Sequence, residues 1–271
     1  MRARRNMRVV ATCVLAVIFL LALGAGVVTP YSYAHQFRDV QTAGPSAAHP
    51  LGTDTLGRDL LSRILYGTRV SLVLAPAAAI VSTLIAGLLG GVAGLLGGWW
   101  ERIILASADL MMALPLLFVL LALRATLPLD VAPLVSAIAT FLILSLLGWP
   151  SSLRVVWAAT RNIRESDYLL LARSNGSGPL RMVMKQIFPN LRPVLLAQFW
   201  VTIPVFILAE ATLSMLGLGV MEPLPSWGNL LRGLENISAF HANPWTIAPL
   251  VLLIVVVICF QLVLPPREDS T

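Results

Sequence analysis

Residues 70–98 have the sequence VSLVLAPAAAIVSTLIAGLLGGVAGLLGG, which contains no charged side chain. A helix crosses the hydrocarbon core of a bilayer, roughly 30 Å thick, with about 20 consecutive apolar residues. This run is long enough and apolar enough to do so. It predicts a membrane-spanning helix, and the fold then depends on how many similar runs the chain contains.

Five more apolar runs occur along the chain, at 9–28, 103–123, 131–149, 194–216 and 245–264. The whole chain is 58% hydrophobic and 12% charged, with a mean hydropathy of +0.84. Soluble domains carry about 25% charged residues. No run shows the sustained alternation of a membrane β-strand. The sequence therefore predicts an all-α integral membrane protein with about six transmembrane helices.

The basic residues predict the orientation of these helices. Of the 19 basic residues, thirteen fall on the side that holds both termini, the loop near 99–102 and the segment 150–193. Loops rich in Lys and Arg remain in the cytoplasm. Both termini are therefore expected to be cytoplasmic. The net charge of +6 is explained by topology and contact with membrane lipid, so it requires no nucleic-acid partner.

This topology predicts three parts. Residues 1–69 form the first transmembrane helix and an external segment, because the first apolar run is longer than that of a cleavable signal peptide. Residues 70–264 form a core of five transmembrane helices with a cytoplasmic loop at 150–193. Residues 265–271 form a cytoplasmic tail. The two cysteines lie in separate predicted spans and the three histidines lack ligand-like spacing, so no metal site is expected.

Motifs of nucleotide or peptide hydrolysis are absent from the sequence. The chain is therefore not expected to be an enzyme, and uphill transport would need a partner or an ion gradient. A gradient-driven secondary transporter is the alternative, and an intramembrane enzyme with a diffuse site also stays open. Asp109 and Glu210 are the acids inside apolar runs. We favour pairing with water or a basic neighbour over a proton or ion relay for both.

Glycines recur at four-residue spacing in the second run, as Gly87 and Gly91 and as Gly90, Gly94 and Gly98. Small residues at this spacing let helix backbones approach closely. Packing within the chain is the favoured interpretation, and a seam along which the helix slides is the alternative.

The segment 165–193, ESDYLLLARSNGSGPLRMVMKQIFPNLRP, interrupts the apolar runs. It predicts two short helices, the first ending at Gly176 and the second beginning at Pro179 and stopping before Pro189. A solvated connecting loop is the simpler interpretation. The leucines at 169–171 argue against it, because a free loop gains nothing by exposing them to water.

Several blocks of the sequence resemble one known family. The spacing of Ala172, Gly176, Ile187 and Pro189 resembles the EAA loop of permease subunits of binding-protein-dependent ABC importers. The blocks HPLGTDTLGRDLLSRILYGTRVSL (49–72), GLLGGWWERIILASADLMMALP (94–115) and ILAEATLSMLGLGVMEPLPSWGNLL (207–231) are similar to the peptide and nickel branch, dipeptide and oligopeptide importers included, and within it to the C-type permease. The resemblance runs from about 49 to 262.

The resemblance implies the ABC importer type I permease fold in a bacterial or archaeal cytoplasmic (inner) membrane. It implies a pathway shared with a second homologous permease, energy from two cytoplasmic ATPase subunits, and delivery of di- or oligopeptides or related solutes by an extracytoplasmic substrate-binding protein. ATP and Mg would bind the ATPase partners, so no cofactor is expected on this chain.

The resemblance also implies two sets of site residues. The ATPase-coupling loop would comprise Tyr168, Leu170, Ala172, Arg173, Gly176, Ile187 and Pro189. The family motif at the external face would comprise His49, Gly52, Asp54, Gly57, Arg58 and Asp59.

Two features of these sets lead to specific expectations. Leu170 stands where the family has an acid, so the polar contact that the acid makes with the ATPase is expected to be absent or replaced by an apolar one. Asp54, Arg58 and Asp59 are close enough in sequence for local ion pairing. Contact with the binding protein or partner permease is the alternative role for these three residues.

Overall fold

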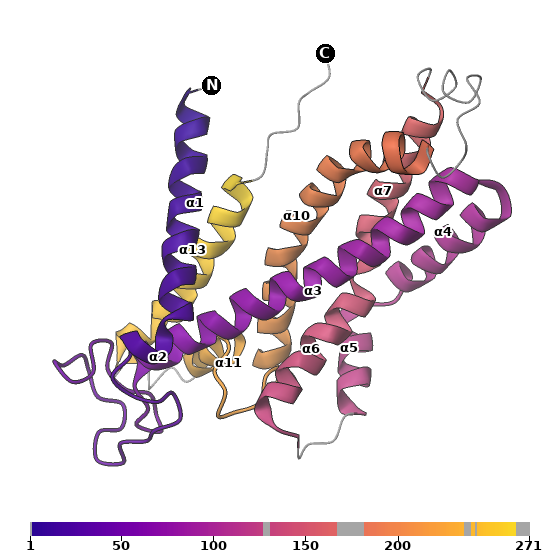
Figure 1. Ribbon diagram of the computed structural model, residues 1–271. Helices are drawn as coiled ribbons and strands as arrows, with labels where there is room; N and C mark the ends of the chain where they lie inside the picture. The colour runs from indigo at the N-terminus through magenta and orange to yellow at the C-terminus, as the bar shows by residue number, and fades with distance from the viewer. Residues whose placement is uncertain (1, 127–130, 167–181, 236–239, 242, 264–271) are drawn as a thin grey trace. The chain divides into compact units, whose positions relative to one another are not determined.

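The computed structural model describes residues 2–126, 131–166, 182–235, 240–241 and 243–263. All regular elements within these ranges are helical (Figure 1). In chain order they are α1 (Arg2–Leu23), α2 (Ala25–Val28), α3 (Leu60–Leu96), α4 (Gly98–Ala113), α5 (Leu116–Ala125), α6 (Pro133–Leu147), α7 (Trp149–Arg164), η1 (Val183–Ile187), α10 (Phe188–Met215), α11 (Trp227–Arg232), η2 (Gly233–Glu235), η3 (Pro244–Ile247) and α13 (Ala248–Val263). The predicted all-α fold is confirmed.

Within the described ranges, five helical stretches are long and apolar enough to cross a membrane: Arg5–Leu23, Leu60–Leu96, Pro133–Arg164, Lys185–Met215 and Pro244–Val263. The remaining predicted span, 103–123, is not one continuous helix. It is divided into α4 and α5 at Leu114, which is extended with φ −80° and ψ 131°. The cause is Pro115, because a proline disfavours helical geometry in the residue before it.

The helix predicted at 70–98 begins ten residues earlier than expected. α3 contains 37 residues, which corresponds to a length of about 55 Å at 1.5 Å per residue. That exceeds the roughly 30 Å of the hydrocarbon core. The extra turns carry Arg63 and Arg69, so the N-terminal end of α3 contributes charged side chains to the region just before the predicted span.

The chain forms two compact units, one comprising Met1–Pro76, Leu121–Leu142 and Ile203–Thr271, the other Ala77–Leu120 and Ile143–Thr202. In the first unit α1 packs along α13, and α11 also contacts α13 (Figure 1). In the second unit α4 packs on α7, and a buried cluster joins them to α3 through Ala86, Ala93, Ile104, Ala108, Trp149 and Leu153.

Two glycines of α3 allow α7 to pack closely against it in the second unit. A Cβ atom on Gly94 would lie 2.7 Å from Cβ of Thr160, and one on Gly90 would lie 2.9 Å from the carbonyl oxygen of Leu153. Side chains at these positions would push the helices apart. Packing within the chain is confirmed for this pair. Gly98 does not belong to the same face, because α3 ends at Leu96 and Gly98 begins α4.

Candidate functional site

The predicted coupling loop is described only at its C-terminal end. Tyr168, Leu170, Ala172, Arg173 and Gly176 lie outside the described residues, as does most of the first predicted helix.

The second predicted helix does not stop before Pro189. The π-helical turn η1 continues directly into α10, which starts at Phe188 and contains Pro189 in its first turn. Because η1 precedes α10 without a break, Pro189 lies inside a continuous helical stretch and removes one amide donor from it, directly after the wider π-helical turn.

Ile187 and Pro189 have different surroundings. Ile187 is 2% exposed and belongs to a buried cluster with Val156, Met182 and Leu191, whereas Pro189 is exposed. Ile187 therefore joins the end of the loop to α7 and α10, and is not available on a docking surface.

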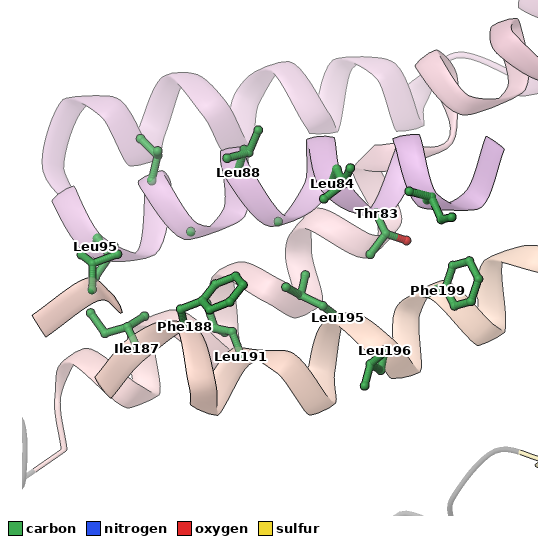
Figure 2. Close-up of a pocket in the computed structure, with 15 residues that line it drawn as sticks. Thr83, Leu84, Leu88, Leu95, Ile187, Phe188, Leu191, Leu195, Leu196 and Phe199 are labelled. Carbon is green, nitrogen blue, oxygen red and sulfur yellow. The ribbon is translucent and has the colours of Figure 1, made fainter. Parts of the chain in front are cut away.

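An apolar groove runs beside Ile187 in the second unit (Figure 2). Its volume is about 490 Å³, and its walls come from α3 between Ile80 and Leu95 and from the segment between Val183 and Phe199. Thr83 is the one polar side chain among the lining residues. The groove offers no charged partner for the ends of a zwitterionic solute, so it is a poor candidate for a polar binding site.

The motif predicted at 49–59 folds into a compact turn in the first unit. Thr53 and Asp59 form an isolated antiparallel bridge, and the amide of Asp54 donates to the carbonyl of Arg58 at 2.9 Å. Gly57 has φ +73°, and a Cβ atom there would lie 2.1 Å from the carbonyl oxygen of Phe37. The turn therefore requires glycine at this position.

Asp59 joins this turn to the start of α3. Its Oδ2 accepts hydrogen bonds from the amide of Ser62 at 2.8 Å and from Ser62 Oγ at 2.7 Å, as a capping residue does. Its Oδ1 lies 3.0 Å from Nδ1 of His49. Both carboxylate oxygens of Asp59 therefore have partners, Oδ2 in the first turn of α3 and Oδ1 at His49. The predicted ion pair with Arg58 is wrong for this acid.

Asp54 does pair with Arg58, as predicted. Asp54 Oδ1 accepts from the amides of Leu56 and Arg58, each at 2.9 Å, and Oδ2 accepts from Arg58 Nε at 2.7 Å. The backbone contacts form the turn, so this carboxylate is both a structural and an electrostatic partner.

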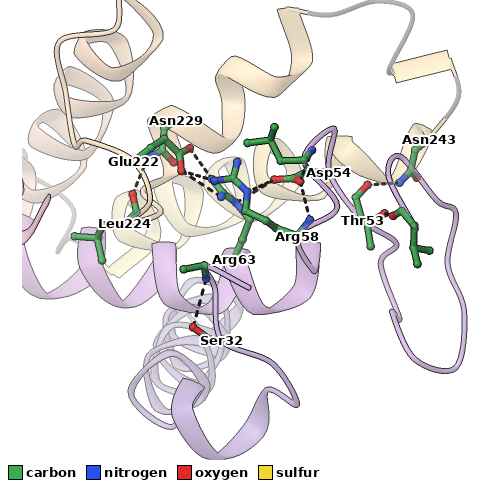
Figure 3. Close-up of polar contacts among 12 residues, drawn as sticks. Ser32, Thr53, Asp54, Arg58, Arg63, Glu222, Leu224, Asn229 and Asn243 are labelled. Carbon is green, nitrogen blue, oxygen red and sulfur yellow. Dashed lines mark hydrogen bonds and ion pairs between the residues drawn. The ribbon is translucent and has the colours of Figure 1, made fainter. Parts of the chain in front are cut away.

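Arg63 and Glu222 complete the cluster and were not predicted from the sequence (Figure 3). Arg63 donates from Nη2 to Oε1 of Glu222 at 2.8 Å and from Nη1 to Oε2 at 3.3 Å. Arg58 Nη1 donates to Oε2 of Glu222 at 2.6 Å. We call Asp54, Arg58, Arg63 and Glu222 the arginine cluster. It ties the motif to the loop between α10 and α11.

The pKa of Glu222 lies below its ordinary value of 4.5. Partial burial alone would raise that pKa, but the hydrogen bonds and positive charges of Arg63 and Arg58 outweigh it. Glu222 is consequently ionised at neutral pH.

The lowered pKa predicts a loss of stability in acid. The contribution of the Glu222 ion pairs is complete above the ordinary pKa of 4.5 and is lost as the pH falls through the lowered pKa. Thermal unfolding midpoints of wild type and Glu222→Gln, measured from about pH 7 to about pH 3, should therefore converge as the pH falls. A gap that stays constant over the whole range would contradict the assignment.

The two acids inside apolar runs have different surroundings. Asp109 pairs with Arg154, which confirms the expectation for this residue. Glu210 is fully buried, and its Oε1 accepts from Ser214 Oγ at 2.6 Å. Glu210 is shielded from water, and its Oε2 has no hydrogen-bond partner among the described residues, so the expectation of water or a basic neighbour is wrong there.

The class of protein is now defined. It is an all-helical, multi-pass membrane protein in which two buried arginines of one unit pair with two acids, and no group of metal-binding side chains occurs in the part of the chain that the structure describes.

Residues 86–265 match the family described as "Binding-protein-dependent transport system inner membrane component", and the chain belongs to this family. It is a permease subunit of an ABC importer in the cytoplasmic membrane, as the resemblance implied.

Curated relatives agree with this placement. The chain is 33% identical over 229 residues to the dipeptide transport system permease protein DppC of Bacillus subtilis, covering 84% of this chain and 70% of the relative. It is 32% identical over 267 residues to the oligopeptide transport system permease protein OppC of Mycobacterium tuberculosis, with 96% and 88% covered. It is 32% identical over 270 residues to the glutathione transport system permease protein GsiD of Pectobacterium atrosepticum, with 98% and 87% covered.

Proposed function

We propose that this permease imports di- or oligopeptides or closely related solutes. It would form the pathway with a second homologous permease, receive substrate from an extracytoplasmic binding protein, and use two ATPase subunits that bind ATP and Mg. The observation that carries the proposal is the similarity over most of the chain to permeases whose names specify dipeptide, oligopeptide and glutathione transport.

The predicted loop at 150–193 is helical at both ends, as α7 and the start of α10, so energy would enter through the segment between these two helices, on the side where both termini are proposed to lie. Ile187 supports this assignment, because it anchors the end of the loop in a cluster shared with α7 through Val156 and with α10 through Leu191. Movement of this segment by the ATPase subunits would then shift α7 and α10 as rigid bodies. Such a shift is expected when a protein switches between two packed arrangements of its helices.

Peptide uptake by the assembled importer tests the substrate class. Proteoliposomes that contain both permeases and both ATPases, supplied with the binding protein, should accumulate a labelled dipeptide or short oligopeptide. An excess of unlabelled peptide should compete, whereas an equal excess of free amino acids should not. Accumulation that peptides do not compete would contradict the proposed substrate.

Leu170 allows a test of the coupling contact. Leu170→Asp should weaken co-purification of the ATPase by at least about tenfold, because an unpaired carboxylate would be buried in an apolar groove of the partner. Asn175→Asp is the matched control, since it adds the same charge at a polar position of the same loop. Unchanged or tighter association of the Leu170 variant would show that the contact is not apolar.

A further inference from the structure

The two arginines of the arginine cluster are almost completely withdrawn from water. The side chain of Arg63 is 2% exposed and that of Arg58 is 9% exposed, whereas that of Glu222 is 46% exposed. Buried charges require partners, and here two acids supply them. We propose that Arg58 and Arg63 form a binding site for the carboxylate group of a small ligand, and that Glu222 occupies this site in the absence of the ligand.

The two acids are held in very different ways. Asp54 accepts two backbone hydrogen bonds within its own turn, so it cannot leave without unfolding that turn. Glu222 has no side-chain partners other than the two arginines among the described residues. One acid is therefore a fixed part of the site, and the other can leave by rotation of its side chain.

The backbone on either side of Glu222 is anchored without the help of its carboxylate. Before it, the amide of Val220 donates to Ser214 Oγ at 3.2 Å. After it, Asn229 Nδ2 donates to the carbonyl of Leu224 at 2.9 Å, and Ser226 and Asn229 form a reciprocal cap at the start of α11. The loop can therefore keep its fold while the Glu222 side chain turns into solvent.

The arginines present the geometry that recognises carboxylates in general. Arg63 holds Glu222 with two parallel hydrogen bonds, and Arg58 adds a third at 2.6 Å (Figure 3). Bidentate pairing of this kind selects the planar carboxylate group and not the chain that carries it. Arg63 Nε is buried and has no acceptor within hydrogen-bond distance among the described residues, its separation from Asp54 Oδ2 being 3.6 Å. Glu222 therefore does not use all the donors of the site.

Removal of Glu222 would leave two buried cations with one acid, so the empty site would attract an anion. If the proposed function is correct, the ligand is the free α-carboxylate of a peptide. The Glu222 side chain is held within a few ångströms of the arginines, so it competes at a high effective concentration. A solute held at the entrance by a binding protein can match that concentration, whereas a dilute free solute cannot.

Rescue of a truncated side chain tests the site without any transport. In the assembled importer, Glu222→Ala should unfold at a lower temperature than wild type. Sodium acetate or N-acetylglycine should raise the midpoint of the variant saturably, by about 3–6 °C at ten times the dissociation constant. Sodium chloride at equal ionic strength should not. Wild type should respond to neither, because its own carboxylate occupies the site.

Two controls make the result specific to the arginine pair. Glu235→Ala removes an exposed acid of the same unit and should show no carboxylate-dependent shift. Arg63→Lys combined with Glu222→Ala keeps the charge but loses bidentate geometry, so most of the acetate effect should disappear. If acetate acts no better than chloride on Glu222→Ala, the cluster is only a structural clamp and the site is refuted, whatever the chain transports.

Transport then identifies the source of the carboxylate. If peptide import is established, wild type should take up a peptide with a free C-terminus faster than its C-terminal amide, and Arg58→Lys with Arg63→Lys should reduce that preference. Acetate rescue together with equal uptake of acid and amide would overturn the peptide as the source.

Discussion

Gly228→Ala should be among the most destabilising single-methyl substitutions in this chain. A Cβ atom at Gly228 would lie 2.4 Å from Cβ of Ser214 and 2.7 Å from Cα of Ala211. Both neighbours belong to α10, whose backbone cannot yield as a flexible side chain does. Overpacking of this kind costs about 3 kcal/mol, which corresponds to a fall of about 6–12 °C in the unfolding midpoint of a domain this size.

Gly233→Ala is the matched control for this prediction. It lies in η2, and a Cβ atom there would meet nothing within 4 Å. Thermal unfolding of both variants in detergent should show a large shift for Gly228 and almost none for Gly233. Equal shifts would mean that the close approach of α11 to α10 does not determine the stability of this region.

Gly176→Pro should abolish coupling without preventing insertion. The sequence places Gly176 at the C-terminal end of a short helix, where left-handed backbone geometry is common. Proline locks φ near −65°, which excludes left-handed geometry, and it also removes an amide donor. Peptide uptake should therefore be lost while ATP hydrolysis continues.

Gly176→Ala provides the graded control for the coupling loop. Alanine keeps the amide donor, so uptake by this variant should lie between that of wild type and that of the proline variant. Membrane abundance and ATPase activity should be measured for both variants in the same preparations. Uptake at the normal rate by Gly176→Pro would contradict the coupling role of the loop.

The positions of most helices could be predicted from the sequence because lipid imposes one simple rule, a long apolar run. The rule failed at 103–123, where hydropathy continues smoothly across Pro115 but the helix does not. The preference of the residue before proline for extended geometry could have revealed that break. Gly90 and Gly94 were read correctly because their spacing reports a helix-packing face directly.

The arginine cluster was only half predictable. Asp54 and Arg58 are four residues apart, and local spacing was enough to predict their ion pair. Arg63 and Glu222 are 159 residues apart, and no single-sequence pattern connects them. For Glu210 the local sequence was misleading. Its position near the end of a predicted span suggested access to water, but the side chain is fully buried and bonded to the hydroxyl of Ser214.

ATP-dependent uptake by reconstituted membranes is the most direct test of this chain as an importer subunit. Proteoliposomes that contain this chain, its partner permease, the ATPase subunits and external binding protein should accumulate peptide with ATP and Mg inside. Omission of any one component should abolish accumulation, and this chain alone should transport nothing under a proton or sodium gradient. Gradient-driven peptide accumulation by the chain alone would contradict its assignment as a permease subunit.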